Sequence, residues 1–505
     1  MSETANKLFL PRKSRNQKKI ERQEAVLGYK QLSSHRRMSL VFLFIWLILI
    51  AYGLMMMFSA SYGISFVQSG SAMRAQSQQI GTSDLSSPIG MIWEADATKL
   101  AKKQAFYMIG GALAAIIFAV IVPFRQLMRP SLRWIVYIVV TLSLVYTFFR
   151  GESFNGAKRW MTIAGITFQS SELAKVGAVF FLASYFSSRL KGRGGKAVKA
   201  KDSAAGQQIS KPKRPSLMKR ALKDVVSPGI LMIIWVILIV IQPHLSGAII
   251  LTMICLVVFF FAPIPPKVKL VGIVQLLVII LVVGMTIGAI YEWKTGRSPV
   301  SYISQRFSHA ARRLDTFQNR EAVSVDDRMQ IDQAEIALGS GGLTGKGLGK
   351  SVQKLNWLSE AHNDFILSII GEELGFLGII AVIILFIAFL VAGLMVARRA
   401  ATPMSVLVAA GYTVMIAIQA FLNMAVAVSL IPATGISLPF FSYGGTANIF
   451  FSFAAGFVLC VSKSGKKENR ELAEILDSTR QRKNSNRGKS DLEDDSAVGY
   501  AIQQM

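Results

Sequence analysis

The chain has 505 residues, of which 52% are hydrophobic and only 17% are charged, and its formal net charge is +27. A mean hydropathy of +0.44, with the apolar residues gathered in blocks, excludes a soluble globular protein. The composition predicts an all-α polytopic membrane protein.

Ten apolar segments are long enough to cross a bilayer as helices, which takes about 20 residues. They cover residues 40–60, 104–122, 132–149, 171–188, 226–241, 244–262, 268–290, 366–397, 403–428 and 445–462. Ten spans place both termini on the same side of the membrane.

Two of the segment boundaries follow from length. The apolar block 226–262 would make about 55 Å of helix, nearly twice the ~30 Å hydrocarbon thickness. We therefore expect a turn at Gln242-Pro243-His244, where the proline breaks the helix. The block 366–397 is also too long for one upright span, and Gly371-Glu372-Glu373 is expected to interrupt it. Its first turns are expected at the surface or in a protein-lined recess.

Positive charge sets the orientation and the domain boundaries. Residues 1–39 hold ten Lys/Arg and residues 189–224 hold twelve, so both segments are predicted to be cytoplasmic. The core spans residues 40–462, with a large extracytoplasmic loop at 293–365 between spans 7 and 8. Residues 463–505 read as a disordered cytoplasmic tail.

Composition also indicates partners. The basic segments 1–39 and 189–224 favour anionic lipid headgroups over nucleic acid. The polar loop 189–224 is expected to be disordered, and residues 63–90 read as a flexible outer loop. Cys255 and Cys460 fall inside spans, so neither a disulfide framework nor a metal cluster is indicated.

A first polar constellation lies at the outer ends of the third and fourth spans. Glu172 and Lys175 are three residues apart, on one helical face, and can pair. Charges inside a span usually line a site, although a structural ion pair that fixes helix packing is the alternative. Arg159 and Trp160 offer a cation and an aromatic face for phosphate and sugar; an interfacial anchoring Trp is the alternative.

The expected outer loop 293–365 carries ten Lys/Arg in spite of the positive-inside rule. As a set they indicate an anionic, lipid-linked ligand such as a pyrophosphate, against the alternative of a solvated surface. Eight of them are Arg306, Arg312, Arg313, Arg320, Arg328, Lys346, Lys350 and Lys354. From Gly339 to Lys350, six glycines alternate with Lys346 and Lys350, a pattern that lets backbone N–H groups approach an anion or makes a flexible linker.

Asp364 is the candidate general base. It precedes an apolar run, so the sequence places it at the outer N-terminus of a helix, where it could instead cap the first turn. A helix N-terminus favours the ionised carboxylate and burial raises its pKa, which is the balance a base needs. Glu360 and His362 are candidates to tune it or to position a hydroxyl.

The last constellation follows the ninth span. Two prolines and three glycines between Asn423 and Gly445 prevent a continuous helix and predict a re-entrant loop beside an outer cavity. Ser442, Tyr443 and Gly444 of this loop are candidate substrate-binding residues.

Five stretches together resemble the SEDS family (shape, elongation, division and sporulation), and the resemblance covers residues 40–462. They are NGAKRW, SELAK, GSGGLTGKGLGKSVQKLNWLSEAHNDFI, GEELGFLG and IPATGISLPFFSYGG. Within the family, QKLNWLSEAHNDF and the long tails are similar to the division (FtsW-like) branch.

The resemblance implies a peptidoglycan glycosyltransferase that polymerises lipid II on the outer face of a bacterial cytoplasmic membrane. It implies that Asp364 is the base and that Arg159 and Lys175 belong to the substrate cavity. It also implies a class B penicillin-binding protein and other cell-division proteins as partners. No tightly bound cofactor is implied, but a divalent cation, Mg or Mn, is expected to support activity.

The sequence departs from the family pattern at two positions. His244 stands where the family usually has Asp, and Asn363 replaces a usual Thr. Two other functions fit the spans and the intramembrane charges: a lipid II flippase and a non-enzymatic divisome scaffold. A flippase should need Glu172 and Lys175 but tolerate loss of Asp364, whereas a scaffold should tolerate substitution at both sites.

Overall fold

The computed structural model describes residues 40–66, 96–154, 157–163, 165–203, 216–242, 244–296, 298, 325–355, 357–358, 360–432 and 435–463. The predicted N-terminal tail, the C-terminal tail from residue 464, and most of the predicted outer loop 63–90 lie outside these residues. So do the predicted loop cations Arg306, Arg312, Arg313 and Arg320.

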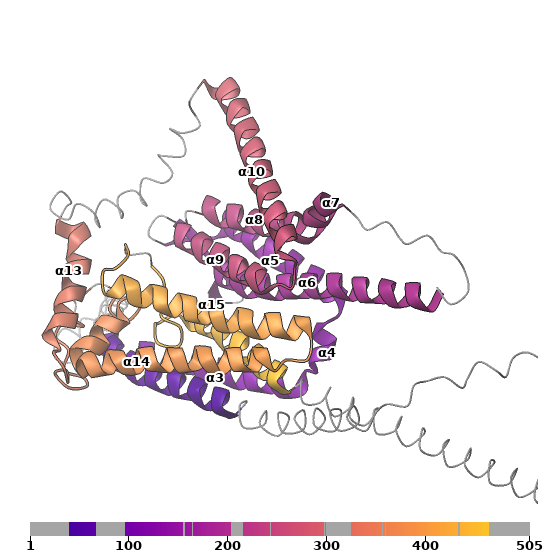
Figure 1. Ribbon diagram of the computed structural model, residues 1–505. Coiled ribbons are helices and arrows are strands. Elements are labelled where there is room, and N and C mark those ends of the chain that lie inside the picture. Colours follow the sequence, from indigo (N-terminus) through magenta and orange to yellow (C-terminus); the bar gives the residue numbers. More distant parts are fainter. Residues whose placement is uncertain are drawn as a thin grey trace, which may run out of the picture.

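Each of the ten predicted apolar segments lies in a helix (Figure 1). In chain order the helices are the first helix Leu40–Phe66, α3 (Lys99–Ile121), α4 (Phe124–Leu127), α5 (Pro130–Arg150), α6 (Ser170–Ser203), α7 (Leu217–Ala221), the π-helix η2 (Leu222–Val226), α8 (Ser227–Ile241), α9 (Leu245–Phe261), α10 (Pro266–Thr295), α13 (Val325–Ser340), α14 (Ile366–Arg398), α15 (Pro403–Ala427) and the last helix Gly445–Lys463.

Eight of the described helices are long and apolar enough to cross a membrane by length and composition. The other two predicted spans are in α9, which has 17 residues, and in α6. The sequence of α6 is apolar over its first half but carries Glu172 and Lys175 in its first turns. The described helices therefore support a multi-pass, mostly helical membrane protein.

The turn predicted at Gln242 is confirmed: α8 ends at Ile241 and α9 begins at Leu245. The Gln242 side chain donates from Nε2 to the Leu144 carbonyl at 2.9 Å. Pro243 itself lies outside the described residues.

The helix α14 is broken, but not at the predicted residues. Gly371, Glu372 and Glu373 are helical and buried, and the non-helical residue is Gly375, with φ 68° and ψ −164°. This conformation is open to glycine because it has no Cβ. The predicted protein-lined recess for the first turns is confirmed, since Ile366 and Ile370 are both 0% exposed.

Two other sequence predictions are corrected. The polar segment 189–224 is not a loop throughout, because α6 continues to Ser203 and α7 begins at Leu217. An established helix adds one hydrogen bond for each residue it extends, and Lys, Arg and Ala favour that extension.

The core also contains a small antiparallel sheet, which the sequence did not predict. Its strands are β1 (Glu152–Phe154), β2 (Ala157–Ile163) and β3 (Ile166–Gln169), in the order β1-β2-β3.

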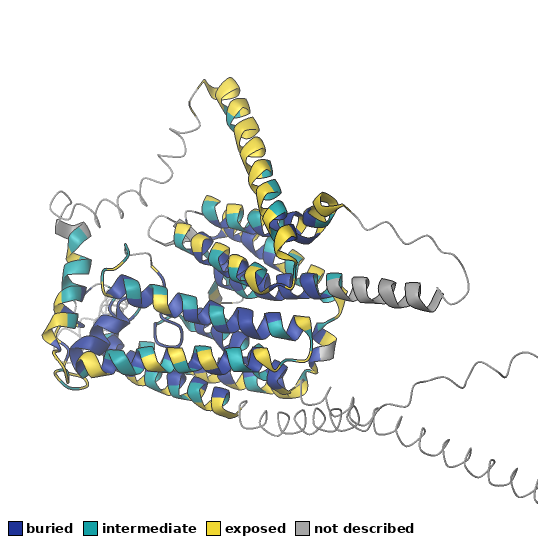
Figure 2. Ribbon diagram, viewed as in Figure 1, coloured by how far each residue is buried: buried dark blue, intermediate teal, exposed yellow. Residues whose placement is uncertain are grey.

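Burial separates the centre of the bundle from its lipid-facing helices (Figure 2). In α15, 72% of an apolar 18-residue stretch is buried inside the protein, so α15 is a core helix. In α10 the corresponding share is only 6%. The buried residues of α10 are Val268 and Gly272, near its start. The rest of α10 projects from the bundle with an exposed apolar surface, as expected for lipid contact.

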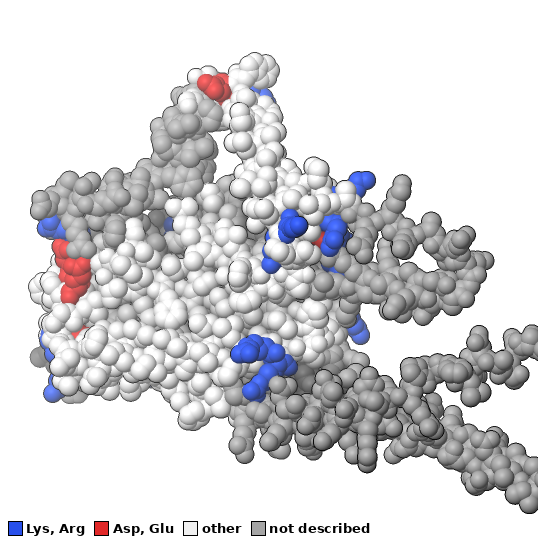
Figure 3. Space-filling model, in the orientation of Figure 1, with Lys and Arg blue, Asp and Glu red and all other residues white. Residues whose placement is uncertain are grey.

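Positive charge gathers at the end of the molecule where α7 lies and α14 finishes (Figure 3). Exposed cations there include Arg129, Lys219, Lys223, Lys267, Arg398 and Arg399. The start of α14, and with it Asp364, lies at the opposite end. The long axis of the bundle therefore separates a basic end from the end that carries the candidate base.

We predict that Gly375→Ala destabilises the fold by about 3 kcal/mol or more, through backbone strain and overpacking. A Cβ at Gly375 would lie 2.4 Å from the Gly345 nitrogen and 2.5 Å from the Leu343 carbonyl oxygen. The measurement is thermal unfolding of the purified protein in detergent. Gly110→Ala in α3 is the control, because a Cβ there meets nothing within 4 Å. Equal unfolding temperatures for the two variants would contradict the prediction.

Candidate active site

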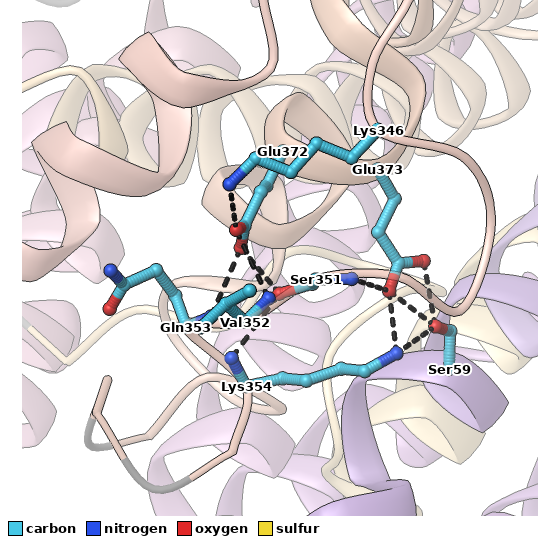
Figure 4. Close-up of polar contacts among 8 residues, drawn as sticks. All are labelled: Ser59, Lys346, Ser351, Val352, Gln353, Lys354, Glu372 and Glu373. Carbon is cyan, nitrogen blue, oxygen red and sulfur yellow. Dashed lines mark hydrogen bonds and ion pairs between the residues drawn. The ribbon is translucent and has the colours of Figure 1, made fainter.

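Two adjacent carboxylates are buried just before the break in α14 (Figure 4). Glu372 and Glu373 are both 0% exposed. A buried carboxylate is costly unless it is paired and hydrogen-bonded. The chain meets that requirement from three distant segments: the first helix, the glycine-rich segment and residues 351–354.

Glu372 is bound from two directions. The Lys346 ammonium lies 2.7 Å from its Oε1. On the other side, Ser351 Oγ donates to Oε2, and the backbone N–H groups of Val352 and Gln353 donate at 3.1 and 3.2 Å. The carboxylate therefore orders the start of the segment that leads to Asp364.

Glu373 joins that segment to the first helix. The Lys354 ammonium lies 2.7 Å from its Oε1, and the Ser59 hydroxyl donates to the same carboxylate at 2.7 Å. Lys354 also donates to Ser59 Oγ at 3.0 Å, which closes a three-membered network. Lys354 is 6% exposed, so this ion pair is buried.

The glycine-rich segment supports the break in α14. The N–H groups of Lys346 and Gly347 donate to the carbonyls of Glu372 and Glu373 at 3.0 and 2.9 Å. In return, Phe376 N donates to the Gly342 carbonyl at 2.9 Å. These amides satisfy backbone groups that the broken helix leaves without intrahelical partners.

Two sequence expectations for this segment therefore change. The N–H groups of Lys346 and Gly347 are engaged with protein carbonyls, and they are not directed at an anion. The ammonium groups of Lys346 and Lys354 are paired with glutamates, so they are not free cations of a solvated loop. Lys350 remains exposed, and its backbone N–H donates to the Gly347 carbonyl at 3.1 Å.

Asp364 lies two residues before the first helical residue of α14, Ile366. The N-cap residue of α14 is Phe365, so Asp364 lies one position before the N-cap. Asn423 of α15 donates to the Asp364 carbonyl at 2.8 Å and to the Ile436 carbonyl at 2.7 Å. Asp364 Oδ2 lies 3.6 Å from the position that a Cβ on Gly435 would take. The half-buried carboxylate thus faces the loop that follows α15.

Glu360 and His362 shape the turn before Asp364. Glu360 has a positive φ of 58°, and its carboxylate accepts a hydrogen bond from Asn363 Nδ2. His362 is 7% exposed, and its ring lies 5.6 Å from that of Tyr443. Burial lowers the pKa of His362 below its usual value of 6.5, and the nearby Glu360 carboxylate opposes this shift only in part.

The predicted re-entrant loop meets this turn. Tyr443 N donates to the His362 carbonyl at 2.8 Å, and Ser442 Oγ donates to the Asn363 carbonyl at 2.7 Å. Gln104 of α3 donates to the Ser442 carbonyl at 3.0 Å and accepts from Gly444 N at 3.3 Å. The loop residues singled out from the sequence therefore lie against the Asp364 turn, and Gln104 fixes them.

The Glu172–Lys175 pair is confirmed as a buried ion pair with an N–O distance of 2.6 Å. The Lys175 ammonium also donates to Gln419 Oε1 at 2.5 Å and lies 5.8 Å from the ring centroid of Phe451. Gln419 in turn donates to the Ser437 carbonyl at 3.4 Å. The ion pair is thus connected to the re-entrant loop.

Arg159 and Trp160 lie on the small sheet beside the start of α6. Trp160 on β2 pairs with Gln169 on β3, the residue before Ser170. Gln169 Nε2 lies 3.1 Å from His244 Nε2. His244, which stands where the family usually has Asp, therefore contacts this sheet.

One face of α15 joins the two constellations. Gln419 and Asn423 are four residues apart, one helical turn, and they reach Lys175 and Asp364 respectively. Sequence reasoning missed Gln419 and also missed Ser59 and Gln104. The available signal was an amide pair at helical spacing inside an otherwise apolar span, which is a site indicator in membranes.

The chain is similar to known proteins over most of its length. The family model described as "Cell cycle protein", which covers FtsW, RodA and SpoVE, matches residues 83–467. The chain is 30% identical over 361 residues to a "Probable peptidoglycan glycosyltransferase FtsW" of Geobacter metallireducens, covering 72% of this chain and 84% of that protein. It is also 30% identical over 380 residues to the Bacillus subtilis protein of the same name, covering 74% and 84%.

A solved structure shares the fold. It is a chain described under "Structural coordination of polymerization and crosslinking by a peptidoglycan synthase complex", with a TM-score of 0.50 and 22% identity. The match covers 80% of this chain and 98% of that one. The likeness supports the helical architecture.

We predict that Asn423→Leu destabilises the protein by about 2 kcal/mol or more, because it leaves one buried and one half-buried carbonyl without their donor. Those carbonyls belong to Asp364 and Ile436. Thermal unfolding in detergent measures the change. Thr413→Val on the same helix is the matched control, since Thr413 Oγ1 has no hydrogen-bond partner among the described residues. A larger loss for Thr413→Val would refute the prediction.

We also predict that acidification weakens the fold through His362. The unfolded chain takes up a proton as the pH falls through 6.5, whereas burial delays this uptake in the folded chain. Stability is therefore lost as the pH falls below the unfolded value. The melting temperature of the wild type should fall more than that of His362→Gln between about pH 7 and about pH 5.5. Parallel decreases in the two proteins would rule out this contribution.

Proposed function

Because the chain belongs to the FtsW, RodA and SpoVE family of cell cycle proteins, we propose that it is a peptidoglycan glycosyltransferase that polymerises lipid II in a bacterial cytoplasmic membrane. In this reaction a sugar hydroxyl of one lipid II attacks the anomeric carbon of a polyprenyl-pyrophosphate-linked glycan. A glycosidic bond forms, the bond to the pyrophosphate oxygen breaks, and the lipid pyrophosphate leaves.

The observation that carries the proposal is the placement of Asp364. Its carbonyl is held by Asn423, and its carboxylate faces Gly435 of the re-entrant loop. As general base, Asp364 accepts the proton that the attacking hydroxyl loses as the glycosidic bond forms. His362 and Glu360 lie on the same turn and contribute to its environment.

Cations are needed where the pyrophosphate leaves. Lys175 is well placed for this role, since it is buried and linked through Gln419 to the loop that faces Asp364. We assign Arg159, Trp160 and Lys350 to the binding of the sugar and pyrophosphate groups, on charge and residue type. Lys346 is assigned to supporting the broken helix, because its ammonium binds Glu372.

A divalent cation is proposed to assist the reaction. Within the described ranges, no group of three or more His, Cys, Asp or Glu could hold a metal ion, so these residues do not form a resident site. Mg²⁺ commonly binds through substrate phosphates with one or two carboxylates. We therefore place any metal requirement with the pyrophosphate-bearing substrate.

Orientation and partners complete the proposal. The basic end with Arg398 and Lys219 is assigned to the cytoplasm, which puts Asp364 on the outer side, where lipid-linked substrate is used. A polymerase of this kind needs a crosslinking enzyme, and we propose a class B penicillin-binding protein as that partner. Other cell-division proteins and anionic lipids at the basic end are further proposed partners.

We predict that Asp364→Asn lowers the rate of glycan formation from purified lipid II by about 100-fold or more, the range for loss of a general base. The assay uses the protein in liposomes with its transpeptidase partner, and glycan chains are resolved by gel. Asp332→Asn, which alters an outer-side carboxylate on α13 paired with Arg328, should polymerise at the wild-type rate.

The same assay decides between the alternatives. If Asp364→Asn polymerises normally, the assignment of the base is wrong. If the wild type makes no polymer but moves lipid II across the liposome bilayer, the protein is a flippase. If it does neither and still recruits the transpeptidase, it is a scaffold.

A further inference from the structure

An ion pair joins the two ends of the segment from Lys354 to Glu373. We call this segment the lobe, and we call the end closed by the ion pair its base. Lys354 Nζ and Glu373 Oε1 lie 2.7 Å apart, and both side chains are buried. Asp364 lies ten residues after the lysine and nine before the glutamate, near the middle of the lobe. The candidate base is thus carried by a segment that begins and ends at one buried contact.

Glu372 closes the base of the lobe a second time. It accepts hydrogen bonds from Ser351 Oγ and from the N–H groups of Val352 and Gln353. We call Ser59, Ser351, Lys354, Glu372 and Glu373 the base clamp (Figure 4). Each of these five residues forms a hydrogen bond or an ion pair with at least one of the others.

The base clamp is anchored outside the lobe. Ser59 belongs to the first helix, and its hydroxyl contacts both Lys354 and Glu373. One turn later, a Cβ on Gly63 would lie 3.2 Å from the Lys354 carbonyl oxygen and from Leu355 Cδ2. The first helix therefore packs against the lobe and gives it a fixed reference in the bundle.

The tip of the lobe is held separately. Asn423 binds the Asp364 carbonyl, and the re-entrant loop binds the carbonyls of His362 and Asn363. These contacts are hydrogen bonds to backbone atoms, and they hold the tip against α15 and the re-entrant loop. The base clamp fixes the two ends of the lobe.

We propose that the base clamp is a positioning device for Asp364, with Lys354 and Glu373 as positioning residues. This inference rests on the proposed role of Asp364 as the general base. A base must lie within about 2.6–3.2 Å of the proton it removes, and a displacement near 1 Å can cost about 100-fold in rate. Buried charges have few geometries in which both are paired, so they specify one arrangement of the lobe.

The test separates positioning from stability by removing both charges together. Lys354→Met leaves Glu373 buried and unpaired, and such single losses are strongly destabilising. The double variant Lys354→Met/Glu373→Leu replaces the pair by apolar groups of similar size, which is often neutral for stability. A merely structural ion pair predicts a folded and active double variant. A positioning ion pair predicts a folded but slow one.

The kinetic readout is polymerisation of lipid II in liposomes. For the double variant we expect kcat to fall by about 10-fold or more, with KM for lipid II within about twofold of wild type. Lys354→Arg, which keeps the charge, should retain most of the activity. The matched control is Lys102→Met/Asp96→Asn, which removes an exposed ion pair, and it should keep the wild-type kcat.

A second readout does not depend on activity. Backbone hydrogen exchange of residues 360–365 should speed up in the double variant, while exchange in α15 stays at the wild-type rate. Ser59→Ala, which removes the bridging hydroxyl and leaves both charges, should give the same pattern with a smaller loss in kcat. This variant also covers the case in which the double variant does not fold.

The outcomes are distinct. Wild-type kcat and wild-type exchange at 360–365 in the double variant, or in Ser59→Ala if the double variant unfolds, overturn the proposal. Faster exchange with unchanged kcat also overturns it, because the clamp would then hold the lobe without positioning the base. If the wild type makes no polymer, the proposed function is overturned. In that case, wild-type exchange at residues 360–365 in the double variant would still show that the base clamp does not hold the Asp364 turn.

Discussion

The burial of two adjacent carboxylates at the break in α14 is the constraint on which the outer end of the molecule depends. An unpaired carboxylate buried in apolar surroundings would destabilise the fold by several kcal/mol or would become protonated. Glu372 and Glu373 are fully buried, and each has an ammonium group at 2.7 Å. Those pairings require the glycine-rich segment and the Ser351–Lys354 segment to lie where they do. They also require Ser59, and therefore the first helix, to reach the same point.

The second organising element is the polar face of α15. Gln419 and Asn423 lie in α15, a largely buried helix, and each bridges elements distant in sequence. Their amides supply donors to backbone carbonyls that no helix or sheet would otherwise satisfy. The ion pair of α6, the re-entrant loop and the Asp364 turn are therefore fixed relative to one another through one helix face. A site assembled in this way is rigid where the chemistry requires rigidity.

The sequence was sufficient for features that depend on local period and length. The turn at Gln242 and the Glu172–Lys175 pair follow from span length or helical spacing and lie as predicted. The ten apolar segments fall in helices, and eight of the described helices are long and apolar enough to cross a membrane. The break at Gly375 was placed a few residues early, because its cause is the contact with Leu343 and Gly345, which no local pattern reveals. The position of Asp364 likewise depends on contacts with Asn423 and Gly435, which lie far from it in the sequence. The Ser59–Glu373 contact joins residues 314 positions apart and is beyond the reach of spacing arguments.

The pairing of the outer lysines changes how a pyrophosphate would be bound. The sequence favoured free cations in the outer loop, but Lys346 and Lys354 each have a glutamate partner, as Lys175 was expected to have. A paired ammonium contributes little net field, yet it still has three N–H groups. Lys175 directs two of them at Glu172 and Gln419, which leaves one donor for a further acceptor. Recognition of the leaving group would then rest on directed, charge-assisted hydrogen bonds in a buried place, where such bonds are stronger than at an exposed surface.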